Sequence, residues 1–459
     1  MGGIRNLESL FNPKTIAVVG ASPTAGKISN IILKSLKHSS FSGKVYPINP
    51  RYKEVQGLKC FKSIADIGAQ VDLAVFAIPA KTVPGALRDS EARLNVAVIV
   101  SGGFGETGEA GRALEKELKE IVSRTGVRVV GPNCMGIYYS FSGVDTFFIP
   151  EDRMKRPGKG GLSIVSQSGS FAVTAMDELA AEGAGAARII SYGNKADVNE
   201  TDCLEFLIDD EQTTAVALYI ESIEEGRRFV DVASRCAAKK PVMALKVGKS
   251  AVGMDAAHSH TGALAGRYEV YKAAFKKAGV IELSGYEDFL SACKALSVLK
   301  KTVAGRRVMI ITDGGGMGVN IADACASLGL EVEPLPEKAK EQMSLLLPRF
   351  CSVSNPMDLT GSATDELFAE ALEKTLDTDG YDLAIVAALW GPPALTDELP
   401  HLISEKAELA DKPVIICSPG GVYTRAKTAL FGKYGLPVFP SPESAARAAS
   451  ILCRGRRKA

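Results

Sequence analysis

The feature that most constrains the fold is a series of short apolar segments that alternates along the chain with stretches of helical spacing. Nearly all of these segments are continuous and rich in β-branched residues, as expected for strands covered on both faces. Amphipathic stretches such as 110–122 and 337–347 lie between them. The alternation predicts parallel, doubly wound α/β sheets. The expected strands are 16–19, 73–78, 96–100, 162–165, 215–220, 242–245, 308–311, 383–389 and 414–417.

Two charged, glycine-containing linkers divide the chain. The first, 153–161, and the second, 300–307, are each followed by a new apolar strand. A length of 459 residues also agrees with three domains of about 150 residues each. We therefore predict three consecutive α/β domains over residues 1–150, 151–300 and 301–459.

The composition is that of an ordinary globular protein. The net charge of +1 gives no electrostatic reason to expect a nucleic acid or an anionic membrane as a partner. No apolar run approaches the roughly 20 residues that cross a bilayer. The nine cysteines are placed singly, without a Cys-x-x-Cys pair, which argues against a zinc site and favours a reducing compartment. We predict a cytoplasmic protein that binds no metal itself.

The turn after the first predicted strand, residues 20–22, is suited to phosphate binding. It contains a glycine and precedes a helix expected from about Ser29. Such turns present backbone N–H groups and a helix dipole to an anion. The second strand, 44–48, ends in Asn49, where an NAD site normally places Asp or Glu. Arg51 instead favours a ligand with a phosphate near its ribose, and coenzyme A is such a ligand.

Further strand ends carry small or polar residues that would line the same crevice. In an open parallel sheet, ligands bind outside the carboxyl ends of the strands. Any one of these residues is better explained by a tight turn, but several at successive strand ends indicate a ligand. The predicted coenzyme A site consists of Gly20, Ala21, Ser22, Asn49, Arg51, Ile78, Pro79, Ser101, Gly102 and Asn133.

Two later turns, one in the second and one in the third domain, are candidates for binding phosphate at a helix start. Hydroxyl residues at such a position either cap the helix or help to bind an anion. Consecutive glycines cost backbone entropy, and we expect them to serve close approach to a ligand rather than packing. One helix terminus contributes only about 0.3–1 kcal/mol toward an exposed anion, so we expect the two turns to converge. The residues are Ser166, Gln167, Ser168 and Gly169, and Gly314, Gly315 and Gly316.

Histidine is scarce, and two of the four histidines lie in one short polar stretch, residues 255–266. With few large apolar residues, this stretch is predicted to be a loop that exposes His260, whose imidazole could act as a nucleophile near neutral pH. The alternative is a helix-capping loop with an incidental histidine. Glu221, at a strand end, could fix the imidazole tautomer or be solvated. Asn194 and Asp197, on another loop, could support the site or form a turn.

These motifs together resemble the α subunit of ADP-forming (NDP-forming) acetyl-CoA synthetase, in the succinyl-CoA synthetase superfamily. The resemblance covers essentially the whole chain, and Ser259-His-Thr-Gly262 is its most specific element. It implies a Rossmann-like coenzyme A-binding domain followed by two flavodoxin-like, doubly wound domains. The other matching motifs are Gly20-Ala-Ser22, Asn49-Pro50, Gly131-Pro-Asn133, Ser166-Gln-Ser-Gly169, Ser191-Tyr-Gly-Asn194, Tyr219-Ile-Glu221, Asp313-Gly-Gly-Gly316 and Asn355-Pro-Met-Asp-Leu359.

The resemblance implies an acid–thiol ligase that reversibly converts acyl-CoA, ADP and phosphate to carboxylic acid, ATP and coenzyme A. His260 would be transiently phosphorylated after an enzyme-bound acyl phosphate forms, with Glu221 as its partner and the two helix starts holding the phosphate. It further implies an ATP-grasp β subunit, in an α2β2 assembly, that binds ADP or ATP with Mg²⁺. Nothing in this sequence looks like that nucleotide domain.

Two alternatives remain open from the sequence. A non-catalytic protein that senses coenzyme A or a nucleotide would use the first domain for binding and would carry no phosphate on His260. An NAD-dependent dehydrogenase is disfavoured by Asn49-Pro50 at the end of the second strand.

Overall fold

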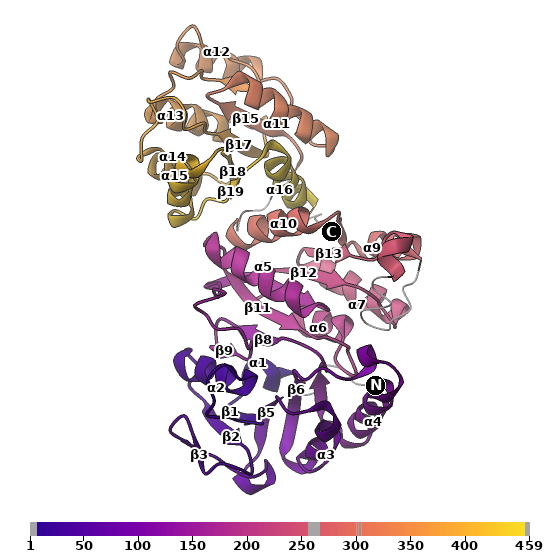
Figure 1. Ribbon diagram of the computed structural model, residues 1–459. Helices are drawn as coiled ribbons and strands as arrows, with labels where there is room; N and C mark the ends of the chain where they lie inside the picture. Colours follow the sequence, from indigo (N-terminus) through magenta and orange to yellow (C-terminus); the bar gives the residue numbers. More distant parts are fainter. Residues whose placement is uncertain (1–6, 256–266, 300, 302, 304, 455–459) are drawn as a thin grey trace. The chain divides into compact units, whose positions relative to one another are not determined.

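The computed structural model describes residues 7–255, 267–299, 301, 303 and 305–454. The chain forms two compact units. Unit 1 comprises Met1–Ala181 and Gly185–Leu283, and unit 2 comprises Glu182–Ala184 and Ser284–Ala459. Figure 1 draws most of unit 1 from indigo to magenta and most of unit 2 from orange to yellow. Each unit is built on mainly parallel β-sheet flanked by helices.

The first sheet of unit 1 has the strand order β2-β1-β5-β6-β7, and all its pairs are parallel. Because the chain proceeds from β1 to one side and then from β5 to the other, the strand order reverses between β1 and β5, where ligands of such sheets bind. The strands are β1 (Thr15–Val19), β2 (Lys44–Ile48), β5 (Val71–Phe76), β6 (Leu94–Ile99) and β7 (Arg128–Val130). The short elements nearby are α1 (Glu8–Phe11), β3 (Glu54–Val55) and β4 (Leu58–Lys59).

The helices cover both faces of this sheet, as the continuous apolar strands predict. Ile16 and Val18 of β1 pack in the same cluster as α2 (Ile28–His38). Ala17 and Val19 face the opposite way and pack with α3 (Val83–Arg88) and α4 (Glu109–Thr125). Successive side chains of a strand point to opposite faces, so every residue of this strand needs an apolar neighbour.

The second sheet of unit 1 has the order β14-β13-β12-β10-β11-β8-β9, and only the pairs that involve β8 are antiparallel among its described strands. Its strands are β8 (Gly136–Tyr139), β9 (Val144–Asp145), β10 (Lys159–Ser166), β11 (Ala186–Ser191), β12 (Ala215–Ile220), β13 (Val242–Lys246) and β14 (Ile281–Leu283). Its helices are α5 (Gly169–Ala181), α6 (Glu200–Leu207), α7 (Gly226–Lys239) and α9 (Tyr268–Ala278).

The first predicted domain boundary, 150/151, does not coincide with the sheets. β8 and β9 precede residue 150, yet they form the antiparallel edge of the second sheet. The chain leaves the first sheet after β7 at Gly136, where φ is +108° and a Cβ would lie 2.5 Å from the Thr146 Oγ1 atom. The charged linker 153–161 therefore lies inside the region that builds the second sheet.

Unit 2 has one five-stranded parallel sheet in the order β16-β15-β17-β18-β19. Its strands are β15 (Val308–Thr312), β16 (Met357–Asp358), β17 (Leu383–Ala387), β18 (Val414–Cys417) and β19 (Val438–Phe439). The helices α10 (Tyr286–Val298), α11 (Gly315–Ser327) and α16 (Pro442–Arg454) contribute to the core on one face. The helices on the other face are α12 (Glu337–Leu346), α13 (Asp365–Leu376), α14 (Leu399–Leu409) and α15 (Val422–Lys433).

The second predicted linker, 300–307, also lies within a compact unit. Ala295 of α10 is fully buried in one cluster with Ala445 and Ala449 of α16 and with Ile310 of the sheet. Because α10 precedes the linker but belongs to this core, unit 2 begins at Ser284 rather than near residue 301.

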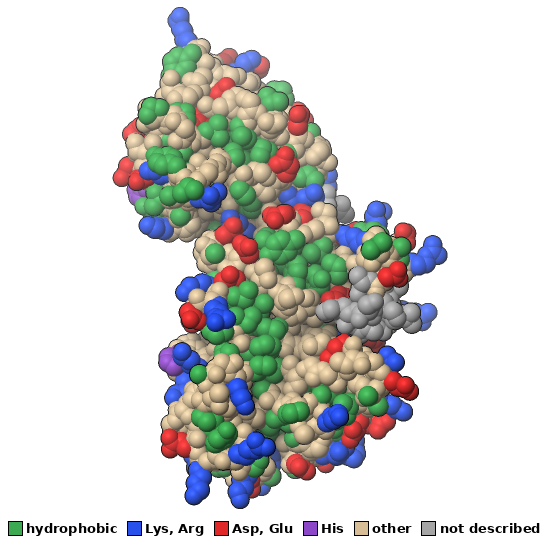
Figure 2. All heavy atoms as spheres, in the orientation of Figure 1, with side chains coloured by type: hydrophobic (Ala, Val, Ile, Leu, Met, Phe, Trp, Pro, Cys, Tyr) green, Lys and Arg blue, Asp and Glu red, His purple; other side chains and the backbone are tan. Residues whose placement is uncertain are grey.

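The surface agrees with the balanced composition. On the visible face of each unit, acidic and basic side chains are interspersed rather than gathered into a field of one sign (Figure 2). No helix within residues 7–255, 267–299 or 305–454 is long and apolar enough to cross a membrane.

Candidate functional site

The turn after β1 is shaped by close backbone packing. Gly20 has φ +90°, and a Cβ there would lie 2.4 Å from the Ala77 carbonyl oxygen, so only glycine fits. The N–H groups of Gly20 and Ala21 donate to the Ile48 carbonyl oxygen at 2.9 and 3.1 Å. These two N–H groups face the sheet, so a phosphate at this turn would meet the backbone from Ser22 onward.

Asn49 ties the end of β2 to the same turn. Its Nδ2 donates to the Ala21 carbonyl oxygen at 2.8 Å, and its Oδ1 accepts the Arg51 N–H at 3.0 Å. The position that holds a ribose in an NAD site is therefore used inside this protein to fix two loops. Arg51 is exposed on the loop that follows, where its guanidinium can meet an anionic ligand.

The later strand ends of the first sheet bring further predicted residues together. Ser101 Oγ donates to the Ile78 carbonyl oxygen at 2.5 Å, and the Asn133 N–H donates to the Ser101 carbonyl oxygen at 3.0 Å. At Gly102 a Cβ would lie 3.2 Å from Asn133 Oδ1, so the glycine admits the asparagine side chain. One edge of the sheet is therefore lined by five of the predicted residues, Ile78, the adjoining Pro79, Ser101, Gly102 and Asn133.

The serines before α5 have structural partners. Ser166, at the end of β10, is fully buried, and its hydroxyl donates to the Ser168 carbonyl oxygen at 2.7 Å. The Ser168 hydroxyl accepts the Phe171 N–H at 3.3 Å and so caps the helix. Gly169 is required by packing, since a Cβ there would lie 2.4 Å from Met135 Cγ. The N–H groups that precede the helical ladder, those of Gly169 and Ser170, are the ones a phosphate would meet.

Gln167 joins this turn to the strand end that carries Glu221. Its side-chain Oε1 accepts the backbone N–H groups of Glu221 and Ser222, both at 3.1 Å. Its backbone N–H donates to the Tyr219 carbonyl oxygen, also at 3.1 Å. Gln167 and Glu221 are both buried, with 5% and 6% of their surface exposed. The structure therefore places Glu221 directly beside the start of α5.

Two charged residues lie near the ends of β12 and β13. Lys246 pairs in register with Ile220, so it lies on the strand next to Glu221. Its Nζ donates to the Val247 carbonyl oxygen and lies 4.6 Å from the centroid of the Tyr271 ring. Burial lowers the pKa of Lys246 to about 8, although the Glu221 carboxylate opposes that fall. Glu221 is therefore held in a buried, electrostatically coupled setting rather than on a solvated strand end.

The turn before α11 in unit 2 repeats the arrangement of the Ser166–Gly169 turn. Thr312 Oγ1 donates to the Gly314 carbonyl oxygen at 3.2 Å, as Ser166 does to Ser168. The Asp313 carboxylate accepts the Leu389 N–H at 3.0 Å, just beyond the neighbouring strand β17. In each turn, the hydroxyl at the strand end donates to a carbonyl oxygen two residues later. The side chain that follows the hydroxyl residue accepts a backbone N–H at the end of the adjacent strand.

Side-chain ends lie close to the first two positions of the triple glycine. A Cβ on Gly314 would lie 2.5 Å from Leu389 Cδ1, and one on Gly315 would lie 2.5 Å from Asp358 Oδ2. Both atoms are the ends of side chains that can shift, so the expectation that these glycines serve approach to a ligand stays a prediction. Gly316 differs, because a Cβ there would meet no atom within 4 Å.

Asp313 places a carboxyl group at the same turn. Burial raises its pKa to about 6, the Leu389 N–H opposes that rise, and Asp358 adds to it. Only 4% of Asp313 is exposed. An anion that approaches the start of α11 above pH 6 meets a negative neighbour as well as the helix dipole.

Two predicted features lie beyond what the structure places. His260, with the rest of 256–266, is outside the described residues, so its pairing with Glu221 stays a prediction. The helix starts at Gly169 and Gly315 belong to separate units, and their convergence on one phosphate also stays a prediction. Among the described residues, no group of three or more His, Cys, Asp or Glu side chains is placed to hold a metal ion.

Glu106 is a residue of the crevice that sequence reasoning missed. Its Oε1 accepts the Gly103 N–H at 2.6 Å, and its Oε2 accepts Asn194 Nδ2 at 2.6 Å. Burial acts to raise its pKa, but these hydrogen bonds outweigh burial and lower it. Asn194 Oδ1 also accepts Asn133 Nδ2 at 3.3 Å, so the loop after β11 reaches a residue predicted to bind coenzyme A. An acidic residue in a glycine-rich stretch gives no signal in sequence, because such residues are usually solvated.

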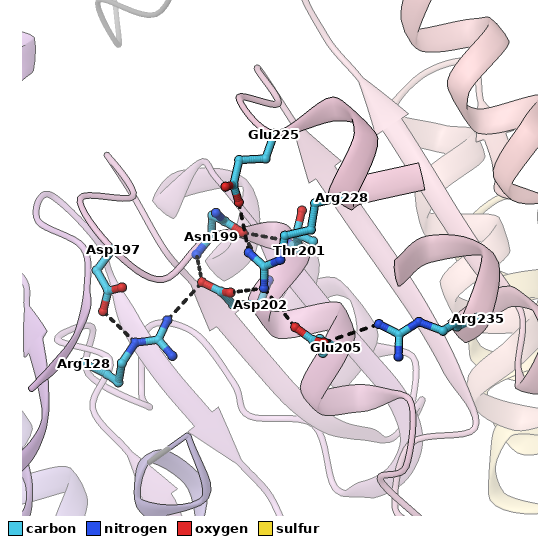
Figure 3. Close-up of polar contacts among 9 residues, drawn as sticks. All are labelled: Arg128, Asp197, Asn199, Thr201, Asp202, Glu205, Glu225, Arg228 and Arg235. Carbon is cyan, nitrogen blue, oxygen red and sulfur yellow. Dashed lines mark hydrogen bonds and ion pairs between the residues drawn. The ribbon is translucent and has the colours of Figure 1, made fainter. Parts of the chain in front are cut away.

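A buried ion-pair network fixes the far side of this loop (Figure 3). Arg128 Nε lies 2.8 Å from Asp197 Oδ2, and Arg128 Nη2 lies 3.0 Å from Asp202 Oδ2. Arg228 extends the network from Asp202 to Glu205 at 2.5 and 2.9 Å. Asp197 also accepts the Val129 N–H, so it anchors this loop to β7. A supporting role for Asp197 at the site stays a prediction.

Comparison with known proteins shows the family to which the chain belongs. Three family models match the chain in order: a CoA binding domain over residues 14–140, a succinyl-CoA ligase like flavodoxin domain over 159–296 and a Ligase-CoA domain over 308–453. The α subunit of acetate–CoA ligase [ADP-forming] II from Pyrococcus furiosus is 38% identical over 451 residues, which cover 97% of each chain. The chain belongs to the ADP-forming acetate–CoA ligase α-subunit family. Its fold class is therefore the expected one, a Rossmann-like CoA-binding domain followed by two flavodoxin-like domains.

Two further members show the extent of the likeness. The chain is 38% identical to acetate–CoA ligase [ADP-forming] I from Archaeoglobus fulgidus, covering 98% of this chain but 63% of that longer relative. A solved chain of the dinucleotide forming acetyl-coenzyme A synthetase 1 from Ca. Korarchaeum cryptofilum, in complex with phosphate and ADP, superposes with a TM-score of 0.92. It is 35% identical, and the match covers 99% of this chain and 97% of that one.

Proposed function

We propose that this α-subunit family member works as part of an NDP-forming acyl-CoA synthetase, which interconverts acyl-CoA, ADP and phosphate with carboxylic acid, ATP and coenzyme A. The observation that carries the proposal is the Gln167 contact, which joins the helix start before α5 to the strand end of Glu221. A phosphate-binding element and a buried carboxylate side by side suit phosphoryl transfer. Relatives that are ligases favour this function over a non-catalytic sensor.

Coenzyme A would occupy the carboxyl edge of the first sheet. Gly20 allows the turn after β1 to pack closely on Ala77, and the exposed Arg51 would pair with a phosphate near the ribose. The thioester end would lie toward Gly102 and Asn133, which the loop carrying Asn194 joins to the second sheet.

The reaction would proceed in three transfers. An oxygen of phosphate attacks the thioester carbonyl, the C–S bond breaks, and coenzyme A leaves as thiolate. A ring nitrogen of His260 then attacks the phosphorus of the acyl phosphate, and the carboxylate leaves. Finally the phosphoryl group passes from the imidazole to ADP, and ATP forms. Glu221 would accept the other ring N–H and so orient the imidazole.

The N–H groups of Gly169 and Ser170, together with those at the start of α11, would hold the transferred phosphoryl group. Helix dipoles stabilise a dianion without a tight Lys or Arg pair, so the group can be passed on.

The nucleotide would bind to a partner. We propose an ATP-grasp β subunit that holds ADP or ATP with Mg²⁺, in an α2β2 assembly in the cytoplasm. The relatives named as α subunits, and the longer relative of which this chain spans 63%, support a second component. Preference among acyl groups would depend on the assembled pocket.

The test is ATP formation by the chain mixed with its β subunit, acetyl-CoA, ADP and phosphate. His260→Ala is expected to abolish ATP formation, because no other group would carry the phosphoryl between the two centres. His401→Ala, at an exposed histidine of α14, is the matched control and should keep the wild-type rate. ATP formation by His260→Ala at the wild-type rate would contradict the mechanism.

A further inference from the structure

Lys195 is a buried cation on the loop after β11. Its side chain is 3% exposed, and its Nζ donates to the Ser222 carbonyl oxygen at 2.8 Å. The Nζ also lies 3.6 Å from Glu200 Oε2, whose side chain is 2% exposed. Lysine is seldom buried so completely without a partner.

The bond from Lys195 to Ser222 helps to hold the strand end that carries Glu221. Gln167 accepts the two N–H groups of Glu221 and Ser222 from one side. Lys195 donates to the carbonyl oxygen of Ser222 from another loop. The polar groups around the Glu221-Ser222 peptide are thus held by two buried side chains from two separate segments.

The loop that carries Lys195 is itself held firmly along the coenzyme-side segment 129–133. The N–H groups of Asn194, Ala196 and Val198 donate to the carbonyl oxygens of Pro132, Gly131 and Val129 at 2.9, 2.9 and 3.0 Å. At Gly193 a Cβ would lie 2.4 Å from the Pro132 carbonyl oxygen, so the close approach of this loop to the 129–133 backbone leaves no room for a side chain. The ion pair of Asp197 with Arg128 anchors the same loop (Figure 3).

The adjacent residues Asn194 and Lys195 of this loop bond to two different parts of the unit. Asn194 bonds to Glu106 and Asn133 of the coenzyme-side loops, and Lys195 bonds to Ser222 beside Glu221. A rigid segment that contacts both places fixes the distance between them.

A structural ion pair is the competing explanation for Lys195. Burial raises the pKa of Glu200, and the ammonium group of Lys195 opposes that rise. The two charges are 3.6 Å apart, however, and taking both out of water is costly, so apolar residues would serve stability as well or better. The short bond of Lys195 is the one to Ser222.

We infer that Lys195 is a positioning residue, whose bond to the Ser222 carbonyl sets the direction of the Glu221 carboxylate relative to the acyl-CoA site. The inference rests on the proposed function, because it assigns Lys195 to the phosphoryl-transfer step and not to thioester cleavage.

The experiment measures the two steps separately in the complete complex, in single turnovers with acetyl-CoA and ³²P-phosphate and without ADP. Release of coenzyme A reports acyl phosphate formation, and acid-labile ³²P on the chain reports transfer to histidine. In Lys195→Met, coenzyme A release should stay within about twofold, whereas labelling should slow by about 10- to 100-fold, because a misplacement of about 1 Å can cost up to about 100-fold. Lys195→Arg, which keeps the donor, should recover part of the rate.

Lys240→Met is the matched control. Lys240 also donates to two backbone carbonyls, of Leu207 and Asp210 at 2.8 and 2.9 Å, in the same unit. Lys240→Met should leave the ratio of the labelling rate to the coenzyme A release rate unchanged, even if the variant is less stable. Lys195→Met combined with Glu200→Gln removes the uncompensated carboxylate, and it tests the same ratio if the single variant folds poorly.

Labelling of Lys195→Met and of the double variant at the wild-type rate would overturn the inference, and so would an equal loss in both steps. If wild-type complex releases coenzyme A but never labels, the proposed function itself is wrong and the inference falls with it. Slower labelling with normal coenzyme A release supports both.

Discussion

Adjacent glycines at the start of α11 differ in their surroundings. A Cβ on Gly314 or Gly315 would displace the side-chain end of Leu389 or Asp358, which would lie 2.5 Å away. Gly316 has open space around its Cβ position, so packing does not account for it. Close approach of a ligand to the backbone is the reason that remains for this third glycine.

Gly316→Ala therefore separates folding from phosphate binding. Alanine is the better helix former and meets no atom within 4 Å, so the free energy of unfolding should not fall. The new methyl group should hinder phosphate at the helix start and raise the KM for phosphate by about tenfold, in line with the contribution of a partly buried helix terminus. Initial rates at varied phosphate concentration measure it.

Gly226→Ala is the control for this substitution. Gly226 begins α7 in unit 1 and also has open space at its Cβ position. It should change neither KM nor stability by much. An unchanged phosphate KM in Gly316→Ala would remove this turn from the site.

Single residues also mark the limit of what the sequence predicts. The hydroxyl and glycine pattern located the turn at Ser166–Gly169, but it did not reveal that Gln167 holds the backbone of Glu221. Neither Lys195 nor Glu106 gave a signal, because a lone charged residue is usually solvated. Which partner a buried side chain meets depends on strands that are distant in sequence.

At the scale of elements, strands β10 and β15 of the two units lead into the same strand–turn–helix arrangement. In each, the residue after the strand-end hydroxyl reaches the neighbouring strand end, Gln167 in unit 1 and Asp313 in unit 2. The amide is neutral, whereas the carboxyl group titrates with a pKa raised to about 6 by burial. The two turns should therefore differ in their response to pH.

Asp313→Asn should stabilise unit 2 at neutral pH. Because the folded pKa of about 6 lies above the ordinary 3.8, the native state binds the proton more tightly and loses stability as pH rises from about 4 to about 6. Asparagine keeps an acceptor for the Leu389 N–H without the charge. The gain at pH 8 should be at most about 3 kcal/mol, at 1.36 kcal/mol per pKa unit, and should vanish near pH 4.

Urea unfolding at pH 4.5 and pH 8 measures this difference. Trp390, the single tryptophan of the chain, lies next to Leu389 and donates to Ser418 Oγ at 3.1 Å, so its fluorescence reports unit 2. Asp323→Asn, at an exposed carboxylate of α11, should change little at either pH. A less stable Asp313→Asn at pH 8 would contradict the argument.

Most long buried strands were predictable, although β11 was not among the expected segments, and the short edge strands β8 and β9 were not predictable. All nine predicted apolar segments form strands, from β1 to β18, because continuous β-branched runs have few other uses in a soluble domain. β8 and β9 contain only four and two residues and pair antiparallel at an edge, so they leave no comparable pattern. The helices at 110–122 and 337–347 are confirmed as α4 and α12.

At the scale of the whole molecule, the division of the chain depends on contacts that composition does not record. The charged linkers suggested boundaries near 150 and 300, but β8 and β9 join the second sheet and α10 joins unit 2. Solvated linkers and exposed loops have similar composition, so only packing distinguishes them. The family assignment was predictable nonetheless, because short motifs at strand ends do not depend on where the domain boundaries lie.

We propose that the phosphoryl group travels on His260 from the acyl-CoA site to the nucleotide on the partner. The most direct measurement labels the complete complex with acetyl-CoA and ³²P-phosphate, identifies the labelled peptide by mass spectrometry, and then adds ADP. The account predicts acid-labile label on His260 alone and its transfer to ATP within a turnover. Label on another residue, or label on His260 that ADP does not remove at the turnover rate, would contradict it.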